Sequence, residues 1–104
     1  MDNFFWTGYC NRERITATSE IEKIVSGFGF ITDFKQFSDI SISLKIELEE
    51  RNIDGLYEAL SKYLRLDDFD RTKSDSIKER IVFLNLTFTK GTGNLEIVIP
   101  AVPG

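Results

Sequence analysis

The sequence predicts an α+β protein, a ferredoxin-like two-layer sandwich with both helices on one face of a single sheet. Residues 40–49 alternate apolar and polar side chains, which is typical of a strand with one buried face. Residues 53–64 carry apolar side chains at helical spacing. Segments of these two kinds follow one another in the order β-α-β-β-α-β, and right-handed crossovers then place both helices on one face of an antiparallel sheet. The 104 residues match the size of one domain, so we expect a single domain over residues 1–104.

The first predicted strand covers residues 3–10, an aromatic segment that ends at the polar stretch NRER. The alternation groups Phe4, Trp6 and Cys10 on one face and leaves open which face is buried. A short helix is predicted over residues 18–29. Ser19 and Glu22 have the spacing of a capping box there, and Gly27 is suited to ending the helix in a left-handed conformation.

A hairpin follows the first helix. Residues 28–37 are aromatic and mostly extended, Ser38 and Asp39 form a short turn, and residues 40–49 form the second arm. The alternation in that arm buries Leu44 and Ile46 and turns Ser43 outward.

The second helix is predicted over residues 53–64, with Asn52 as its N-cap and a favourable pair between Glu58 and Lys62. Residues 65–79 are densely charged, and we expect an exposed loop without regular structure.

Residues 80–90 form the fourth predicted strand, and the turn GTGN at 91–94 leads into a last strand at 95–100. We therefore expect an extra C-terminal strand hairpinned onto the fourth. Its outer edge would offer backbone groups for strand addition, because only Glu96 and a terminal proline protect it.

Two helices on one face leave the other face of the sheet uncovered. We expect this open face, together with the C-terminal edge strand, to contact a protein partner or a second copy of the chain. The predicted contact residues are Ser41, Ser43, Lys45, Phe83, Asn85, Thr87, Glu96 and Val98.

The sequence contains no histidine, which removes the commonest general base and the usual metal ligand. Cys10 is followed by Arg12 and Arg14, but no base or orienting partner is near it in the sequence, so we interpret it as a small apolar residue. The acidic residues of segment 67–75 lack the glycine and the spacing of a calcium loop. We expect no enzyme activity, no metal and no cofactor.

The formal charge is −4, from 17 acidic and 13 basic residues. Negative charge opposes binding to nucleic acid and to an anionic membrane surface, so we expect neither as a partner. The open face carries aromatic residues, yet residues 80–90 lack the motif of RNA-binding sheets. A single cysteine and the absence of a signal-peptide pattern favour the cytoplasm.

In element order and spacing, residues 3–64 resemble ACT-like regulatory modules, particularly through GFITDFKQFSDISISLKIELEERNIDGLYEAL. The resemblance implies a ferredoxin-like sheet that binds amino acids or other small effectors at a dimer interface. It assigns no binding residue in this chain. The first functional hypothesis is thus a small non-enzymatic protein-interaction module, and the alternative is an ACT-like small-molecule-binding regulatory domain.

Overall fold

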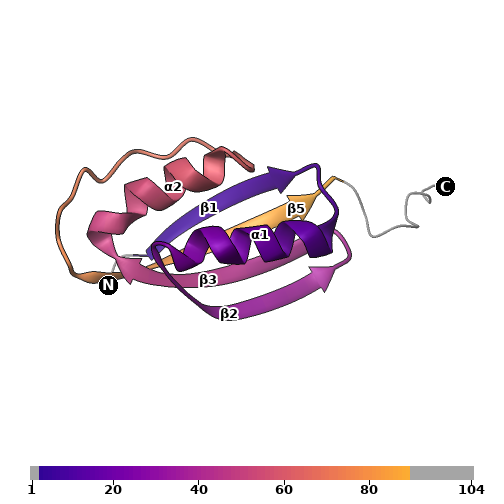
Figure 1. Ribbon diagram of the computed structural model, residues 1–104, viewed down its shortest axis with the longest axis horizontal. Coiled ribbons are helices and arrows are strands. Elements are labelled where there is room, and N and C mark those ends of the chain that lie inside the picture. Colours follow the sequence, from indigo (N-terminus) through magenta and orange to yellow (C-terminus); the bar gives the residue numbers. More distant parts are fainter. Residues whose placement is uncertain (1–2, 90–104) are drawn as a thin grey trace.

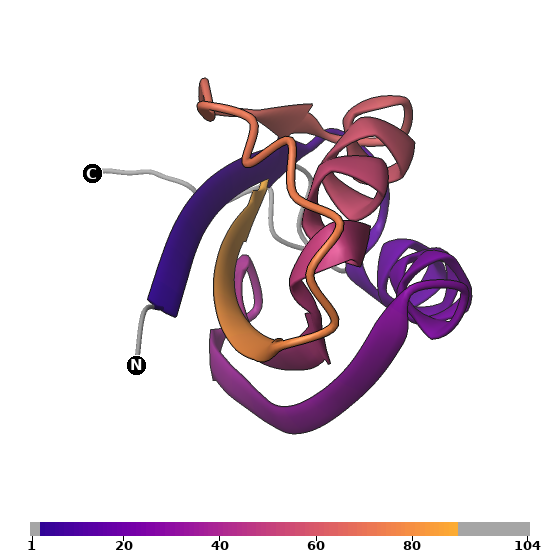
Figure 2. The same ribbon diagram turned by 90° about the vertical axis from the view of Figure 1, so that its left-hand side faces the viewer.

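The computed structural model describes residues 3–89, in which one mixed sheet carries both helices on the same side (Figures 1 and 2). The α+β class expected from the sequence is confirmed. The elements are β1 (Asn3–Cys10), α1 (Arg14–Ser26), β2 (Gly29–Ser38), β3 (Ser41–Glu49), a 3-10 turn (Glu50–Asn52), α2 (Ile53–Ser61), β4 (Arg65–Leu66) and β5 (Glu79–Phe88).

The strands lie in the order β2-β3-β5-β1-β4. The ferredoxin-like order is not confirmed, because β1 and β5 are neighbours and run parallel from the pair Asn3–Ile81 to the pair Cys10–Phe88. On its other side, β5 pairs antiparallel with β3. Since β5 has a neighbour on both sides, it has no free edge for the hairpin strand that was expected to extend it. Residues 91–94 and 95–100 lie outside the described residues.

The core lies between the helices and one face of the sheet. The alternation predicted for β3 is confirmed, since Leu44 and Ile46 are buried and Ser43 lies on the opposite face. In β1 it is the face of Trp6 and Cys10 that is buried. Apolar side chains of α1 and α2 complete the core: Ala17, Ile21, Val25, Ile53, Leu56, Tyr57 and Leu60.

Helix α1 begins four residues before the start predicted from its apolar spacing. Its N-cap is Glu13, whose carboxylate accepts hydrogen bonds from the backbone N–H groups of Thr16 (3.1 Å) and Ile15 (3.2 Å). These two hydrogen bonds lower the pKa of Glu13. The predicted cap Ser19 is therefore inside the helix. Gly27 ends α1 with φ −81°, not in the left-handed conformation that we expected.

Asn52 stands at the start of α2, but its side chain makes no capping hydrogen bond. It donates instead to the backbone carbonyl of Phe28 (3.1 Å), which ties α2 to the turn between α1 and β2. The predicted partner of Glu58 also differs, since Glu58 accepts from Arg71 (Nε to Oε2, 3.1 Å) in a distant part of the sequence.

Residues 67–78, here called the return segment, carry the chain back along α2 to the end of the sheet where β5 begins (Figure 1). The topology requires this length, because β5 runs antiparallel to β3 although a helix separates the two strands in sequence. The sequence predicted a loop over 65–79. Residues 65 and 66 correct this, since they form β4 and pair with Tyr9 and Gly8.

The return segment is fastened to α2 and β1 by specific contacts. Phe69 packs against Trp6 and Tyr57, each at 5.1 Å between ring centroids, and the Tyr57 hydroxyl donates to the Asp67 carbonyl (2.6 Å). Asp54 accepts from the backbone N–H groups of Thr72 (2.9 Å) and Lys73 (2.8 Å). The segment is therefore held in place although it has no regular secondary structure.

Asp54 makes stability depend on pH. Partial burial raises the pKa of Asp54, but the hydrogen bonds from Thr72 and Lys73 outweigh this effect, and the net pKa is lowered. A lowered folded-state pKa stabilises the fold above the unfolded pKa of about 3.9, and this stabilisation is lost as the pH falls through the folded pKa. We predict that Asp54→Asn lowers the free energy of unfolding by about 1 kcal/mol at pH 7.

The measurement is urea denaturation of the parent and the variant between pH 7 and pH 2.5. The difference between them should shrink as the pH drops below about 4. Asp68→Asn, which removes an exposed carboxylate from the same segment, is the control and should leave stability nearly unchanged at every pH. A constant difference for Asp54→Asn across the pH range would contradict the prediction.

A second prediction concerns the core. Leu44 is buried between Phe34 and Leu84 on the neighbouring strands, so Leu44→Ala should lower the free energy of unfolding by about 2–5 kcal/mol. Ser43→Ala, one residue earlier on the opposite face, should change it by less than about 0.5 kcal/mol. Chemical denaturation of both variants tests the register of β3, and a larger loss for Ser43→Ala would show that the faces are inverted.

Candidate interaction surface

The face of the sheet opposite the helices, here called the open face, is built from the alternate residues of four strands. The register aligns these residues in rows that cross the sheet. One row is Asp33, Lys45, Phe83 and Phe5; the next is Lys35, Ser43, Asn85 and Thr7; and Ser41, Thr87 and Tyr9 form a third. The polar residues of β3 thus face the same side as aromatic residues of β1 and β5.

The structure brings together six of the eight residues predicted for contact. Ser41 is paired with Thr87, Ser43 with Asn85, and Lys45 with Phe83. Glu96 and Val98 lie outside the described residues. Sequence reasoning left out Phe5, Thr7 and Tyr9, because the alternation of β1 did not show which of its two faces is buried.

The open face carries an aromatic stack on β5 and β1. The rings of Phe5 and Phe83 lie 5.3 Å apart between centroids and are nearly parallel, at 13°. Phe5 is a large apolar side chain that is 70% exposed, and it lies on β1 where β4 no longer pairs with that strand. Aromatic side chains are enriched in protein–protein interfaces, where they bury a large area at a low cost in conformational entropy.

The open face becomes acidic toward the end where β2 and β5 begin. Glu49 and Glu79 are direct cross-strand partners, and Glu47 lies one row away. Like charges directly opposite each other on a sheet are destabilising. Arg51 donates to Glu49 (Nε to Oε1, 2.7 Å) and offsets part of this repulsion.

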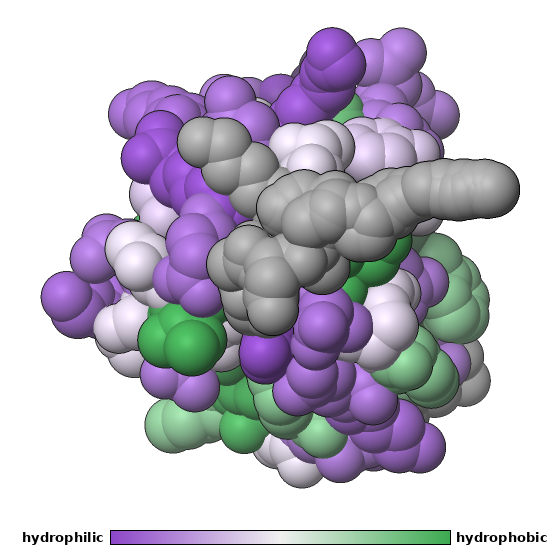
Figure 3. All heavy atoms as spheres, turned by 90° about the vertical axis from the view of Figure 1, so that its right-hand side faces the viewer, coloured by the Kyte–Doolittle hydropathy of each residue, from purple (hydrophilic) through white to green (hydrophobic). Residues whose placement is uncertain are grey.

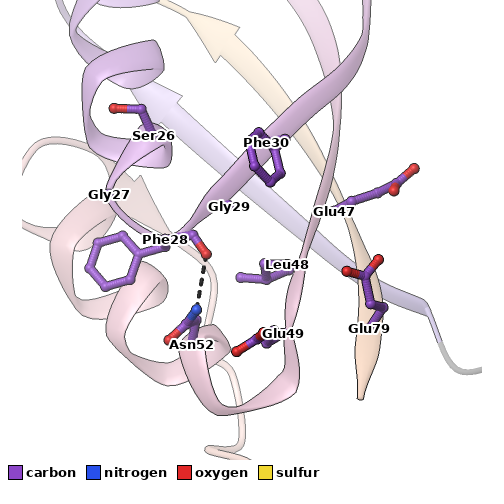
Figure 4. A pocket seen from close by; sticks show the side chains of 10 residues that line it. All are labelled: Ser26, Gly27, Phe28, Gly29, Phe30, Glu47, Leu48, Glu49, Asn52 and Glu79. Atoms are coloured by element: carbon purple, nitrogen blue, oxygen red, sulfur yellow. Dashed lines mark hydrogen bonds between the residues drawn. The ribbon is translucent and has the colours of Figure 1, made fainter. Parts of the chain in front are cut away.

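A pocket of about 500 Å³ adjoins this acidic end (Figure 4). Its walls combine the turn between α1 and β2 with the ends of β3 and β5, including Phe28, Phe30, Glu47, Glu49, Asn52 and Glu79. Gly29 allows the two strands to approach closely here, since a Cβ atom at this position would lie 2.4 Å from the Glu47 carbonyl oxygen. The pocket thus presents carboxylates beside aromatic rings.

The structure also places the other residues that the sequence analysis considered for catalysis or metal binding. Cys10 is 2% exposed and lies in the core at the end of β1. Within residues 3–89, no three or more cysteine or acidic side chains are grouped so as to hold a metal ion. The acidic residues at 67–75 belong to the return segment, where Asp67 contributes its backbone to contacts with Tyr57 and Thr7.

Further exposed apolar side chains lie at the opposite end of the molecule, where β2 ends and α1 begins. They include Ile15 (65% exposed) and Phe37 (67% exposed). Figure 3 looks onto this end and shows hydrophobic residues scattered among hydrophilic ones. The visible part of this end therefore has no single large apolar patch.

Comparisons with protein-family models, with curated proteins and with solved structures find no match to this chain. Neither of the two helices in the described part of the chain has the length and apolar character needed to cross a membrane.

Proposed function

We propose that the protein is a non-enzymatic protein-interaction module that binds a protein partner through the open face. The observation that carries this proposal is the exposed stack of Phe5 on Phe83 on that face. Around it lie short polar side chains such as Ser43 and Asn85, which can exchange hydrogen bonds with a partner. Protein interfaces combine exposed aromatic side chains with polar groups in this way.

The charges on the open face suggest the chemistry of the partner. Glu47, Glu49 and Glu79 make one end acidic, and the protein as a whole has a formal charge of −4. A partner with an apolar centre and lysine or arginine side chains at one end would complement this surface. The negative charge would repel nucleic acid and anionic membranes, so we propose neither as a partner.

The proposal includes the absence of catalysis and a cytoplasmic location. The sequence offers no histidine, and the single thiol, Cys10, is buried, which supports a binding role over a chemical one.

The test is quantitative capture of partners from an extract of the native host. Phe5→Thr removes the exposed ring and keeps a residue suited to strands, so it should weaken retention of a specific partner by about tenfold or more. Lys45→Glu, next to the stack and outside the acidic end, should weaken the same interaction, because a partner group that accepts a hydrogen bond from Lys45 would then face a carboxylate. Both variants should retain their fold, since losing the stack costs only about 0.5–1.5 kcal/mol.

Ile77→Thr is the matched control, because Ile77 is 67% exposed but belongs to the return segment. Partners that bind the open face should be retained by Ile77→Thr and lost from Phe5→Thr. Equal retention by the parent, Phe5→Thr and Lys45→Glu would contradict binding through this face.

The pocket in Figure 4 favours a second candidate function, an ACT-like domain that binds a small effector. Its carboxylates suit the ammonium group of an amino acid, and Phe28 and Phe30 offer apolar surface to a side chain. We predict for this alternative that one member of an amino-acid panel raises the melting temperature of the parent and that Glu79→Gln abolishes the rise. Thermal unfolding with light scattering measures both effects, and an unchanged melting temperature with every amino acid would rule the alternative out.

A further inference from the structure

Strand β2 forms one edge of the sheet. Eight of its ten residues pair with β3 on one side, and no other strand in residues 3–89 lies on its outer side. The backbone N–H and C=O groups on that outer side are thus available for pairing with another strand.

The side chains of β2 are unusually exposed for a strand rich in aromatic residues. Phe30 is 75% exposed, Phe37 67% and Phe34 43%. Phe34 lies on the helix side of the sheet, because its partner on β3 is the buried Leu44. Its exposure shows that the described helices do not extend over the outer edge of β2.

The middle of β2 is regular although its ends are not. The register with β3 shifts between Ile31 and Asp33 and again between Gln36 and Ser38. Between these irregularities, residues 33–36 pair continuously. Asp33 and Lys35 lie opposite Lys45 and Ser43 and therefore share the open face, while Phe34 lies on the other side.

We propose that two copies of the chain associate through their β2 strands, which pair antiparallel about a two-fold axis at Phe34. In this register Asp33 lies opposite the partner's Lys35, and Lys35 lies opposite the partner's Asp33. Phe34 lies beside the partner's Phe34 on the helix side. The pair joins two sheets into one continuous sheet, and the helices of both copies lie on the same side of it.

The charges select this register over its neighbours. A two-fold axis perpendicular to the sheet must pair residues that share a face, so the axis passes through Asp33, Phe34, Lys35 or Gln36 in the regular stretch. An axis at Gln36 places Lys35 opposite Phe37 of the second copy and forms no pair of opposite charges. Centring on Asp33 opposes two aspartates, and centring on Lys35 opposes two lysines. Only the axis at Phe34 replaces these repulsions with two pairs of opposite charge and also covers two exposed phenylalanine rings.

Lysine on an edge strand commonly discourages strand addition. On β2, however, Lys35 favours one particular partner. This partner is an antiparallel strand that places an aspartate directly opposite Lys35. A second copy of β2 supplies this pattern by symmetry. This self-association is independent of partner binding by the open face.

The test uses two single substitutions of opposite sign. Asp33→Lys places lysines opposite each other in the proposed pair, and Lys35→Asp places aspartates opposite each other. Sedimentation velocity over a concentration series should show dimers for the parent, and each variant alone should dissociate with a dissociation constant at least about tenfold higher. An equimolar mixture of the two variants should recover the dimer, because every lysine then faces an aspartate.

Asp68→Lys and Lys62→Asp make the same changes of charge at exposed positions away from β2 and should leave the dimer intact. Circular dichroism and melting temperatures establish that all variants fold. Phe5→Thr should also dimerise like the parent, which separates this proposal from the role of the open face.

A parent that is monomeric at millimolar concentration would overturn the proposal, as would a dimer that survives both substitutions. A mixture that stays monomeric would overturn the register. Hydrogen exchange at residues 29–38 distinguishes pairing between two copies from coverage of β2 within one copy. Amide protection that does not depend on concentration would mean that another segment of the same chain covers β2, and this result would also overturn the proposal.

Discussion

The parallel pairing of β1 with β5 is the constraint on which the rest of the structure depends. It joins the first and last described strands along the length of β1. Because β5 also pairs with β3, it connects β1 to the hairpin of β2 and β3 in one sheet. β5 then has neighbours on both sides, while β2, whose one neighbour in the described sheet is β3, forms an edge. The same register places Phe5 opposite Phe83, so the aromatic stack of the open face is a direct consequence of this pairing.

That topology requires the return segment. A helix between two adjacent antiparallel strands leaves the chain at the wrong end of the sheet, and residues 67–78 bring it back. Such a length of irregular chain loses conformational entropy on folding and gains no ladder of hydrogen bonds in return. Here the packing of Phe69 on Trp6 and Tyr57 and the hydrogen bonds to Asp54 offset this loss. The charge of the segment is therefore not a sign that it is unstructured.

The sequence predicts which face of a strand is buried better than it predicts which strands are neighbours in the sheet. Alternation in β3 depends only on which side chains are apolar, so the burial of Leu44 and the exposure of Ser43 could be predicted. Strand order depends on contacts between residues far apart in the chain, and β1 buries the same residues beside β3 as beside β5.

Local chemistry also misled the prediction of helix ends. Glutamate is not among the preferred N-cap residues, so Glu13 gave no signal, whereas Ser19 had the spacing of a capping box and lies inside α1. Ala17, four residues before Ile21 on the same face, was the available sign of an earlier start, since both are buried. Six contact residues could be placed on one face from alternation alone. Phe5 could not, because its position beside Phe83 follows from the pairing of β1 with β5.

The two edges of the sheet differ in their capacity to accept another strand. β4 has only two residues, and the chain leaves the sheet immediately after it, with the Asp67 carbonyl held by Tyr57 and Phe69 packed on Trp6. A strand added on this side could pair only with the outer side of residues 3–6 of β1, since β4 covers Gly8 and Tyr9 and the Asp67 N–H donates to the Thr7 carbonyl. β2 is five times as long and keeps a regular stretch at its centre. β2 thus offers the longer unpaired edge of the described sheet, and on it Asp33 and Lys35 flank an exposed phenylalanine. Growth of the sheet is therefore favoured at this edge and in the one register that the two charges permit.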